Sequence, residues 1–254
     1  MYLVVLAQYR ANMAVWSLAS ILQIIVYMSV WIAVADARGG STSGYTANTF
    51  AGYFLVLLIV RDMTMTWIPY DLPGQVRKGD LAPKLIRPFH PVLMTVADMF
   101  AFRVQSVLTV VPIAAVMFLV FDARIAGSVG AVLAAIALIP LASVTRALVD
   151  TLFASTSLWL VRIDGIRNLY YMLLLLLGGQ FAPLALFPAW LQNGARALPF
   201  YWTLGYPTEL AIGTAPLSEA WIGALVLTGW ALVTFAVLQP VWRAGIRAHE
   251  AVGS

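Results

Sequence analysis

The chain has no cysteine and few charged side chains for its length. Without cysteine there can be no disulfide, no thiolate metal site and no cysteine nucleophile. Only 10% of the 254 residues are charged, whereas an average soluble domain has about 25%. No polar stretch is long enough to form a separate soluble domain, so the composition places the chain in the membrane class.

Glutamate and histidine are also scarce. The glutamates are Glu209, Glu219 and Glu250, and the histidines are His90 and His249. They do not cluster at metal-ligand spacing, and no serine lies in a nucleophile-elbow motif. The glycines of the stretch 74–79 imitate a phosphate loop, but Asp80 and Leu81 stand where Lys and Ser or Thr are required. We therefore predict no metal, cofactor or nucleotide site in this chain, and no enzyme chemistry.

What the chain does have is a series of long apolar segments. Hydrophobic residues make up 62% of the sequence, and one membrane crossing needs about 20 of them in a row. The pattern predicts an all-α integral membrane protein with one domain over residues 1–254. We predict six crossings, at about 13–35, 48–67, 92–121, 127–160, 168–186 and 220–242. The fourth is interpreted as one long helix that Pro140 can kink.

The stretch 187–218, between the fifth and sixth crossings, is apolar but interrupted by Pro188, Pro199, Pro207 and Pro216. Proline breaks helices, so this stretch cannot be one straight helix. Short helices that dip part-way into the bilayer fit better, since neighbouring protein can satisfy their backbone.

Lysine and arginine are distributed unevenly over the connecting segments. One set of segments holds Arg10, Arg77, Lys78, Lys84, Arg87, Arg162, Arg167, Arg243 and Arg247, and the opposite set holds Arg38, Arg124 and Arg196. Because basic loops stay in the cytoplasm, this asymmetry predicts that both termini are cytoplasmic.

A basic insert, residues 70–91, separates the second and third crossings. Apolar side chains alternate there with charged ones, which favours a short amphipathic helix that docks on a soluble partner. An ordinary solvated loop that obeys the positive-inside rule is the other interpretation. Within the crossings, Arg146 and Asp150 are spaced i,i+4 and can pair. Charged residues there indicate snorkelling or subunit packing, or else a proton pathway.

Four stretches of sequence carry a family resemblance. They are QYRANMAVWSLASIL, VRKGDLAPKLIRPFHP, GGQFAPLALFPAWLQNGARALPFYWTLGYPTELAIGT and RAGIRAHEAVGS. The pattern resembles the permease subunits of type-2 ATP-binding-cassette transporters, the exporter-type membrane domains of bacteria. The insert motif G-x-L-x-x-x-L-I-R-P and the run LPF-Y…P-x-E-L-x-x-G are the most specific parts.

The resemblance implies a fold and a coupling site. It implies six transmembrane helices, an interfacial helix at Met1–Arg10, a cytoplasmic coupling helix between helices 2 and 3, and re-entrant extracellular helices between helices 5 and 6. The implied ATPase contacts are Gln75, Val76, Arg77, Lys78, Gly79, Asp80, Leu81, Leu85 and Arg87. Charge reversal at Arg77 and Lys78, or Leu81→Asp, is then expected to uncouple ATP hydrolysis from transport without unfolding the membrane part.

The resemblance also implies partners and a pathway. It implies two ABC ATPase subunits that bind ATP and Mg, a second permease that is identical or homologous, surrounding lipids of the bacterial inner membrane, and no nucleic acid. The implied pathway-lining residues are Tyr53, Leu57, Thr64, Leu173, Leu177 and Phe181. The implied function is ATP-driven export of a hydrophobic or amphipathic compound. The alternatives are a secondary transporter driven by an ion gradient, and a membrane-embedded enzyme or scaffold.

Overall fold

The computed structural model describes residues 21–85, 103, 107–108, 110–160 and 162–252. These residues are almost entirely helical, with one short antiparallel hairpin. The elements are a helix Ile21–Ala37, β1 (Ser41–Thr42), β2 (Tyr45–Thr46), α2 (Ala47–Thr64), α3 (Ile68–Lys78), α4 (Ala82–Leu85), a helix Val110–Val120, α6 (Val129–Ala154), η1 (Ser155–Leu158), α7 (Asp164–Leu177), η2 (Leu184–Leu186), α8 (Ala189–Ala197), α9 (Pro199–Thr203), α10 (Gly205–Ile212), η3 (Leu217–Glu219) and α11 (Ala220–Val252).

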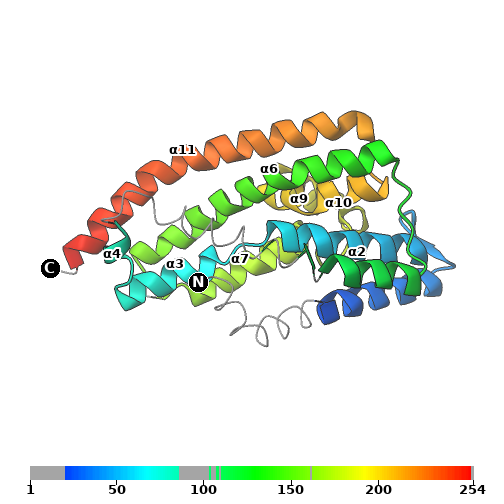
Figure 1. Ribbon diagram of the computed structural model, residues 1–254, viewed down its shortest axis with the longest axis horizontal. Helices are drawn as coiled ribbons and strands as arrows, with labels where there is room; N and C mark the ends of the chain where they lie inside the picture. The colour runs from blue at the N-terminus through cyan, green and yellow to red at the C-terminus, as the bar shows by residue number, and fades with distance from the viewer. Residues whose placement is uncertain (1–20, 86–102, 104–106, 109, 161, 253–254) are drawn as a thin grey trace.

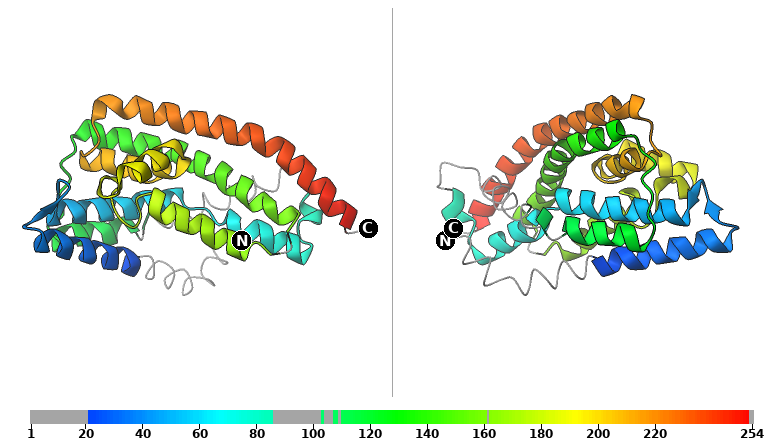
Figure 2. Two further views of the ribbon diagram at one scale, coloured as in Figure 1. Left: turned by 180° about the vertical axis from the view of Figure 1, so that it is seen from behind. Right: turned by 45° about the vertical axis from the view of Figure 1, so that its right-hand side comes forward.

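The helices form an elongated bundle with two distinct ends (Figure 1). α6 and α11 run side by side along most of its length in every view (Figures 1 and 2). The short helices α9 and α10 pack against α6, and α10 also packs against α2. We call the end with α3, α4 and the last turns of α11 the basic end, and the opposite end, with β1 and β2, the hairpin end.

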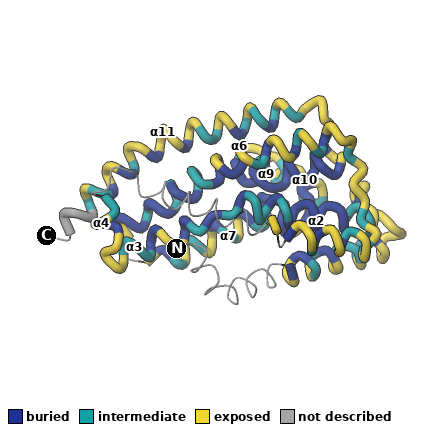
Figure 3. Tube along the Cα trace, in the orientation of Figure 1, coloured by how far each residue is buried: buried dark blue, intermediate teal, exposed yellow. Residues whose placement is uncertain are grey.

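α2 lies at the centre of the bundle. Its residues from Phe50 to Leu58 are all buried, and Figure 3 shows this stretch in the colour of buried residues while much of α11 is exposed. A helix that is apolar on every side belongs inside a protein or a membrane. α2 therefore forms the core on which the rest of the bundle packs.

Gly52 allows a close approach between α2 and the segment before α6. A Cβ atom at this position would lie 2.2 Å from the backbone carbonyl oxygen of Arg124. Gly52→Ala is therefore expected to lower the free energy of unfolding by about 1–3 kcal/mol. Gly229→Ala in α11, where nothing lies within 4 Å, is the matched control and is expected to be neutral or slightly stabilising. Equal unfolding curves for the two variants in detergent micelles would contradict this contact.

Within the part of the chain that the structure describes, three helices are long and apolar enough to cross a membrane: Ala47–Lys78, Val129–Leu158 and Leu217–Ala248. They contain most of the predicted second, fourth and sixth crossings, and α6 runs through Pro140 without a break. α11 continues well past Trp242, where the crossing was expected to end, to Val252. Of the first and third predicted crossings the structure describes the shorter apolar helices Ile21–Ala37 and Val110–Val120; residues 13–20 and 92–102, like the predicted interfacial helix 1–10, lie outside the described residues.

The predicted fifth crossing, 168–186, differs from the observed helix. α7 begins earlier, at Asp164, and ends at Leu177, so it spans about 21 Å at 1.5 Å per residue. Gly178 and Gly179 follow, and Gly179 has a φ of +75°, which is a conformation that favours glycine and ends helices. The proline-rich stretch after it forms the separate short helices η2, α8, α9, α10 and η3.

Candidate functional site

The basic insert forms a helical turn at the basic end of the bundle. α2 ends at Thr64 because the ring of Pro69 would clash with the carbonyl of Met65 in a continuous helix. α3 then begins with Pro69 in its first turn and ends at Lys78, and Gly79 caps it with a φ of +76°. After this left-handed glycine the chain reverses into α4. The segment predicted to be the coupling helix is therefore a near-continuation of α2 that turns back at Gly79.

The predicted ATPase-contact residues divide into exposed and buried ones. Arg77, Lys78, Gly79 and Asp80 are exposed at the turn, and Gln75, Val76 and Leu85 are half-buried. Leu81 is fully buried. Arg87 lies outside the described residues. The turn thus presents two cations, one glycine and one carboxylate to the surroundings.

Leu81 belongs to a small hydrophobic core of the basic end, which is separate from the main core. Its neighbours there are Ile68, Leu72, Ala154, Leu158 and Trp242, from α3, the end of α6, η1 and α11. The alternating pattern predicts that Leu81 faces a soluble partner, and the family resemblance implies that this partner is an ATPase. In this conformation the Leu81 side chain instead packs against α3, α6, η1 and α11 of the same chain. It is fully buried, so a partner cannot contact it.

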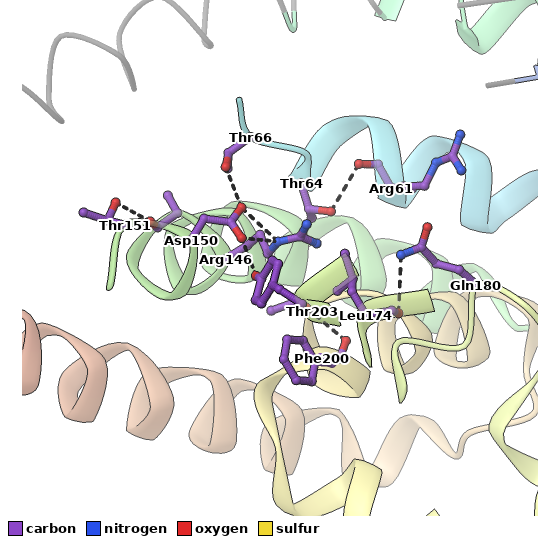
Figure 4. A network of polar contacts seen from close by, with 12 residues as sticks. Arg61, Thr64, Thr66, Arg146, Asp150, Thr151, Leu174, Gln180, Phe200 and Thr203 are labelled. Carbon is purple, nitrogen blue, oxygen red and sulfur yellow. Dashed lines mark hydrogen bonds and ion pairs between the residues drawn. The ribbon is translucent and has the colours of Figure 1, made fainter. Parts of the chain in front are cut away.

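A buried cluster of polar side chains ties the base of α3 to α6 and α7. We call Thr66, Arg146, Asp150 and Tyr170 the Asp150 cluster. Arg146 Nε lies 3.1 and 3.0 Å from the two carboxylate oxygens of Asp150, which confirms the ion pair expected from the i,i+4 spacing. The hydroxyls of Thr66 and Tyr170 donate to the same carboxylate. Figure 4 shows Thr66 and Arg146 converging on Asp150.

All four residues of the Asp150 cluster are buried. A buried ion pair is costly to desolvate, and it is stable only when further hydrogen bonds satisfy it. Each Asp150 oxygen accepts the guanidinium and one hydroxyl, so the carboxylate is fully engaged. Sequence reasoning missed Thr66 and Tyr170, since neither residue type nor spacing signals a partner that lies 84 or 20 residues away.

A second contact joins α3 to the start of α7. The guanidinium carbon of Arg167 lies 4.5 Å from the centre of the Tyr70 ring, and Arg167 also pairs with Asp164 at 2.5 Å. Tyr70 stacks on Tyr171 with ring centres 5.7 Å apart. Such cation–π and aromatic contacts each contribute about 0.5–1.5 kcal/mol. α3 is therefore joined by side-chain contacts to α7 as well as to α6.

The predicted pathway residues also divide by burial. Tyr53, Leu57, Thr64 and Leu177 are buried within the chain, whereas Leu173 and Phe181 are 38% and 37% exposed. Tyr53 donates a 2.8 Å hydrogen bond to the backbone carbonyl of Gly179. Among the six candidates, only Leu173 and Phe181 are therefore accessible at the surface of the chain in this conformation.

The run LPFYWTLGYPTEL forms a buried contact in the short helices near the hairpin end. The hydroxyl of Tyr201 in α9 donates to Oε2 of Glu209 in α10 at 2.6 Å. Burial raises the pKa of the Glu209 carboxyl, while the Tyr201 hydrogen bond and nearby Arg196 act in the opposite direction. The tyrosine and glutamate of this motif thus hold α9 and α10 together.

Comparison with known families assigns nearly the whole chain to one family. A family model described as "ABC-2 family transporter protein" matches residues 20–253, which is nearly the entire chain and includes α3, the Asp150 cluster and the short helices. The chain belongs to the ABC-2 transporter family. No curated protein and no solved structure matches it.

As an ABC-2 permease, the chain is a multi-pass membrane component of an ABC transporter, and it associates with ABC ATPase subunits that carry the ATPase site. Among the described residues there is no group of three or more His, Cys, Asp or Glu side chains that could hold a metal ion.

Proposed function

We propose that this chain is the transmembrane subunit of an ATP-driven exporter, and that the turn at Arg77–Asp80 is its docking site for the ATPase. The observation that carries the proposal is the combination of two features at the basic end. The turn is exposed, and the helix that leads to it is fastened by Thr66 and Tyr70 to α6 and α7. An exposed tip on a firmly attached helix is suited to receive a force and pass it on.

The wider assembly is proposed on the basis of the family. Two ATPase subunits bind ATP and Mg, and two permeases, identical or homologous, enclose the pathway. The Lys and Arg residues that gather at the basic end support a cytoplasmic location for it and for both termini in a bacterial plasma membrane. The proline-interrupted helices α8 to α10 are proposed to be re-entrant from the outside. The pathway runs along α2, α7 and the segment that follows α7, where Leu173 of α7 and Phe181 after it are exposed. The four buried candidates would reach it only after α2 and α7 separate.

The test is charge reversal at the turn. In the double variant Arg77→Glu and Lys78→Glu, we expect the amount of co-purified ATPase from the same gene cluster to fall about tenfold or more, because two attractive charges become repulsive. The matched control is Arg38→Glu with Arg124→Glu, which makes the same charge change at exposed positions of the hairpin end. Pull-down through the permease and ATP hydrolysis of the complex are the measurements.

The absence of native cysteine allows a topology control. A single cysteine replaces either Ser43 at the hairpin end or Asp80 at the basic end. The two cysteines should be labelled from opposite sides of the membrane, both in the parent chain and in the charge-reversed chain. If the charge-reversed permease keeps its topology and retains the ATPase at the level of the parent, the turn is not the docking site.

A further inference from the structure

The short helix α10 is buried along its whole length, although it contains a glutamate. All its residues from Gly205 to Ile212 are buried. The helix packs on α6, α2 and α9 inside the bundle (Figure 1). Glu209 is only 9% exposed. Glutamate is almost never buried unless its charge is paired, so the surroundings of this carboxyl must stabilise it in another way.

The Glu209 carboxyl has few hydrogen-bond donors. The Tyr201 hydroxyl donates to Oε2 at 2.6 Å, and the backbone N–H of Leu184 adds a weaker stabilisation of the charge. Oε1 is enclosed and has no hydrogen-bond partner among the described residues. A carboxylate has about four acceptor positions, and its charge is costly to bury when they are not filled. A neutral carboxyl would leave only an uncharged oxygen without a partner, so the site suits the protonated form better.

The other polar groups near Glu209 do little for its charge. Arg196 of α8 is exposed and attracts the ionised carboxylate only through its charge. The Tyr53 hydroxyl, on α2, already donates to a backbone carbonyl. The Tyr45 hydroxyl, on β2, is directed to Thr214 Oγ1 at 3.5 Å. The hydroxyls from these two elements are therefore engaged with other acceptors.

The remaining charged and titratable groups of the elements around α10 are paired, exposed or distant. Arg146 and Asp150, the two charged residues of α6, pair with each other, and Tyr206 of α10 itself donates to a backbone carbonyl. The charged residues of α2 and α11 lie near the ends of these helices that point towards the basic end. The acids and bases of the adjoining connections are all exposed: Asp36, Arg38, Asp122, Arg124 and Glu219. Among the described residues, Arg196 is therefore the cation that acts on Glu209.

The balance of these effects favours the proton. Burial raises the pKa of the Glu209 carboxyl above its ordinary value of 4.5, and the Tyr201 hydrogen bond, Arg196 and the Leu184 N–H offset only part of this rise. Burial also raises the pKa of Tyr45 and Tyr201, so these hydroxyls stay neutral. A carboxyl whose pKa is raised by folding contributes stability that is complete below its ordinary pKa. This stability is lost as the pH rises through the raised pKa.

We infer that Glu209 is a proton-binding site that controls the packing of α10. With the proton bound, α10 stays packed on α2 and α6. When the proton leaves, the carboxylate is better satisfied in an opened arrangement in which it reaches water or Arg196. The inference stands apart from the proposed function, because it requires neither an ATPase nor a transported compound.

Hydrogen exchange of the full-length chain in nanodiscs tests this site. Deuterium uptake is followed in peptides from α9 and α10 between about pH 5 and about pH 8, and is corrected for the intrinsic pH dependence of exchange. In the parent chain we expect the opening of α10 to increase about tenfold or more over this range. Glu209→Gln, a neutral side chain of the same shape, should hold the opening within about twofold at every pH. Glu219→Gln, which removes an exposed acid beside α11, is the matched control and should keep the parent profile.

Tyr201→Phe gives a second readout that a purely structural role would not move. Because this variant removes the hydrogen bond that Oε2 accepts, the Glu209 carboxylate loses stabilisation and the midpoint of the pH profile should rise by about half a pH unit or more. Arg196→Gln should move the midpoint in the same direction by less, since Arg196 is exposed. A general loosening of α9 would instead increase exchange at every pH and leave the midpoint in place.

Three results would overturn the inference. They are a flat profile of the parent chain, a pH dependence that persists in Glu209→Gln, and an opening that increases as the pH falls. If Glu209→Gln yields no folded protein, the Tyr201→Phe midpoint decides alone, and an unchanged midpoint then overturns the inference.

Discussion

Asp150→Ala is expected to lower the free energy of unfolding by about 3–5 kcal/mol. The substitution leaves the Arg146 guanidinium without its counter-charge. This is costly because the Arg146 side chain is only 5% exposed, so water cannot replace the carboxylate. It also removes the acceptor of the Thr66 and Tyr170 hydroxyls. Because these residues belong to three different segments, the loss should loosen the base of α3 as well as α6. Denaturant unfolding of the purified permease in micelles measures the change.

Two comparisons make the Asp150 result interpretable. Asp164→Ala removes the carboxylate of a more exposed pair, in which the Asp164 side chain is 49% exposed, and should cost less than about 1 kcal/mol. The double variant Arg146→Met with Asp150→Leu removes both charges and should recover much of the stability that Asp150→Ala loses, since well-packed apolar residues can replace a buried pair. Similar losses in Asp150→Ala and Asp164→Ala would mean that the cluster does not hold the bundle together.

Leu81→Asp is expected to destabilise the basic end by at least about 3 kcal/mol. The substitution removes a fully buried apolar side chain and places a carboxylate among Ile68, Leu72 and Trp242 without a partner. From the sequence alone, Leu81→Asp was expected to uncouple ATP hydrolysis from transport without unfolding the membrane part. The burial of Leu81 leads us to expect a loss of stability instead. Leu81→Met, which conserves volume, should cost less than about 1.5 kcal/mol.

The exposed neighbour Asp80 supplies the control for Leu81. Asp80→Ala changes a surface residue of the same turn and should stay within about 0.5 kcal/mol of the parent. Thermal unfolding gives the stability of each variant, and limited trypsin cleavage at Lys78 and Lys84 shows whether the turn itself has opened. A Leu81→Asp chain as stable and as protease-resistant as Asp80→Ala would show that Leu81 does face a partner.

The sequence predicts the long helices well because length and hydropathy alone determine them. α6 and α11 are continuous apolar segments, and each was located within a few residues at its start. α7 was misplaced because LLLLLGG is as apolar as a crossing needs; what ends the helix is the left-handed Gly179 and its carbonyl bond to Tyr53, a residue far away in sequence. The continuation of α11 past Trp242 was missed because charged residues end a crossing without ending a helix.

The site was predictable only in part, for a related reason. The i,i+4 spacing of Arg146 and Asp150 is local, so the pair could be read from the sequence. The alternation of Leu81 with charged neighbours shows that one side is apolar, but it cannot tell whether a partner or the chain itself covers that side. Thr66, Tyr70 and Tyr170 are ordinary residues whose role appears only when α3, α6 and α7 come together.

The two hydrophobic cores have a consequence for how the molecule moves. The core around α2 and the core around Leu81 are packed by different residues, and the helical backbone between them is interrupted at Met65–Trp67. α6 and α11, in contrast, run unbroken from one core to the other, with Ala142 and Leu227 in the core around α2 and Ala154 and Trp242 in the core around Leu81. A push on the turn at Arg77–Asp80 would therefore have to bend or shift α6 and α11 as whole helices, and it could not be absorbed at Met65–Trp67 alone.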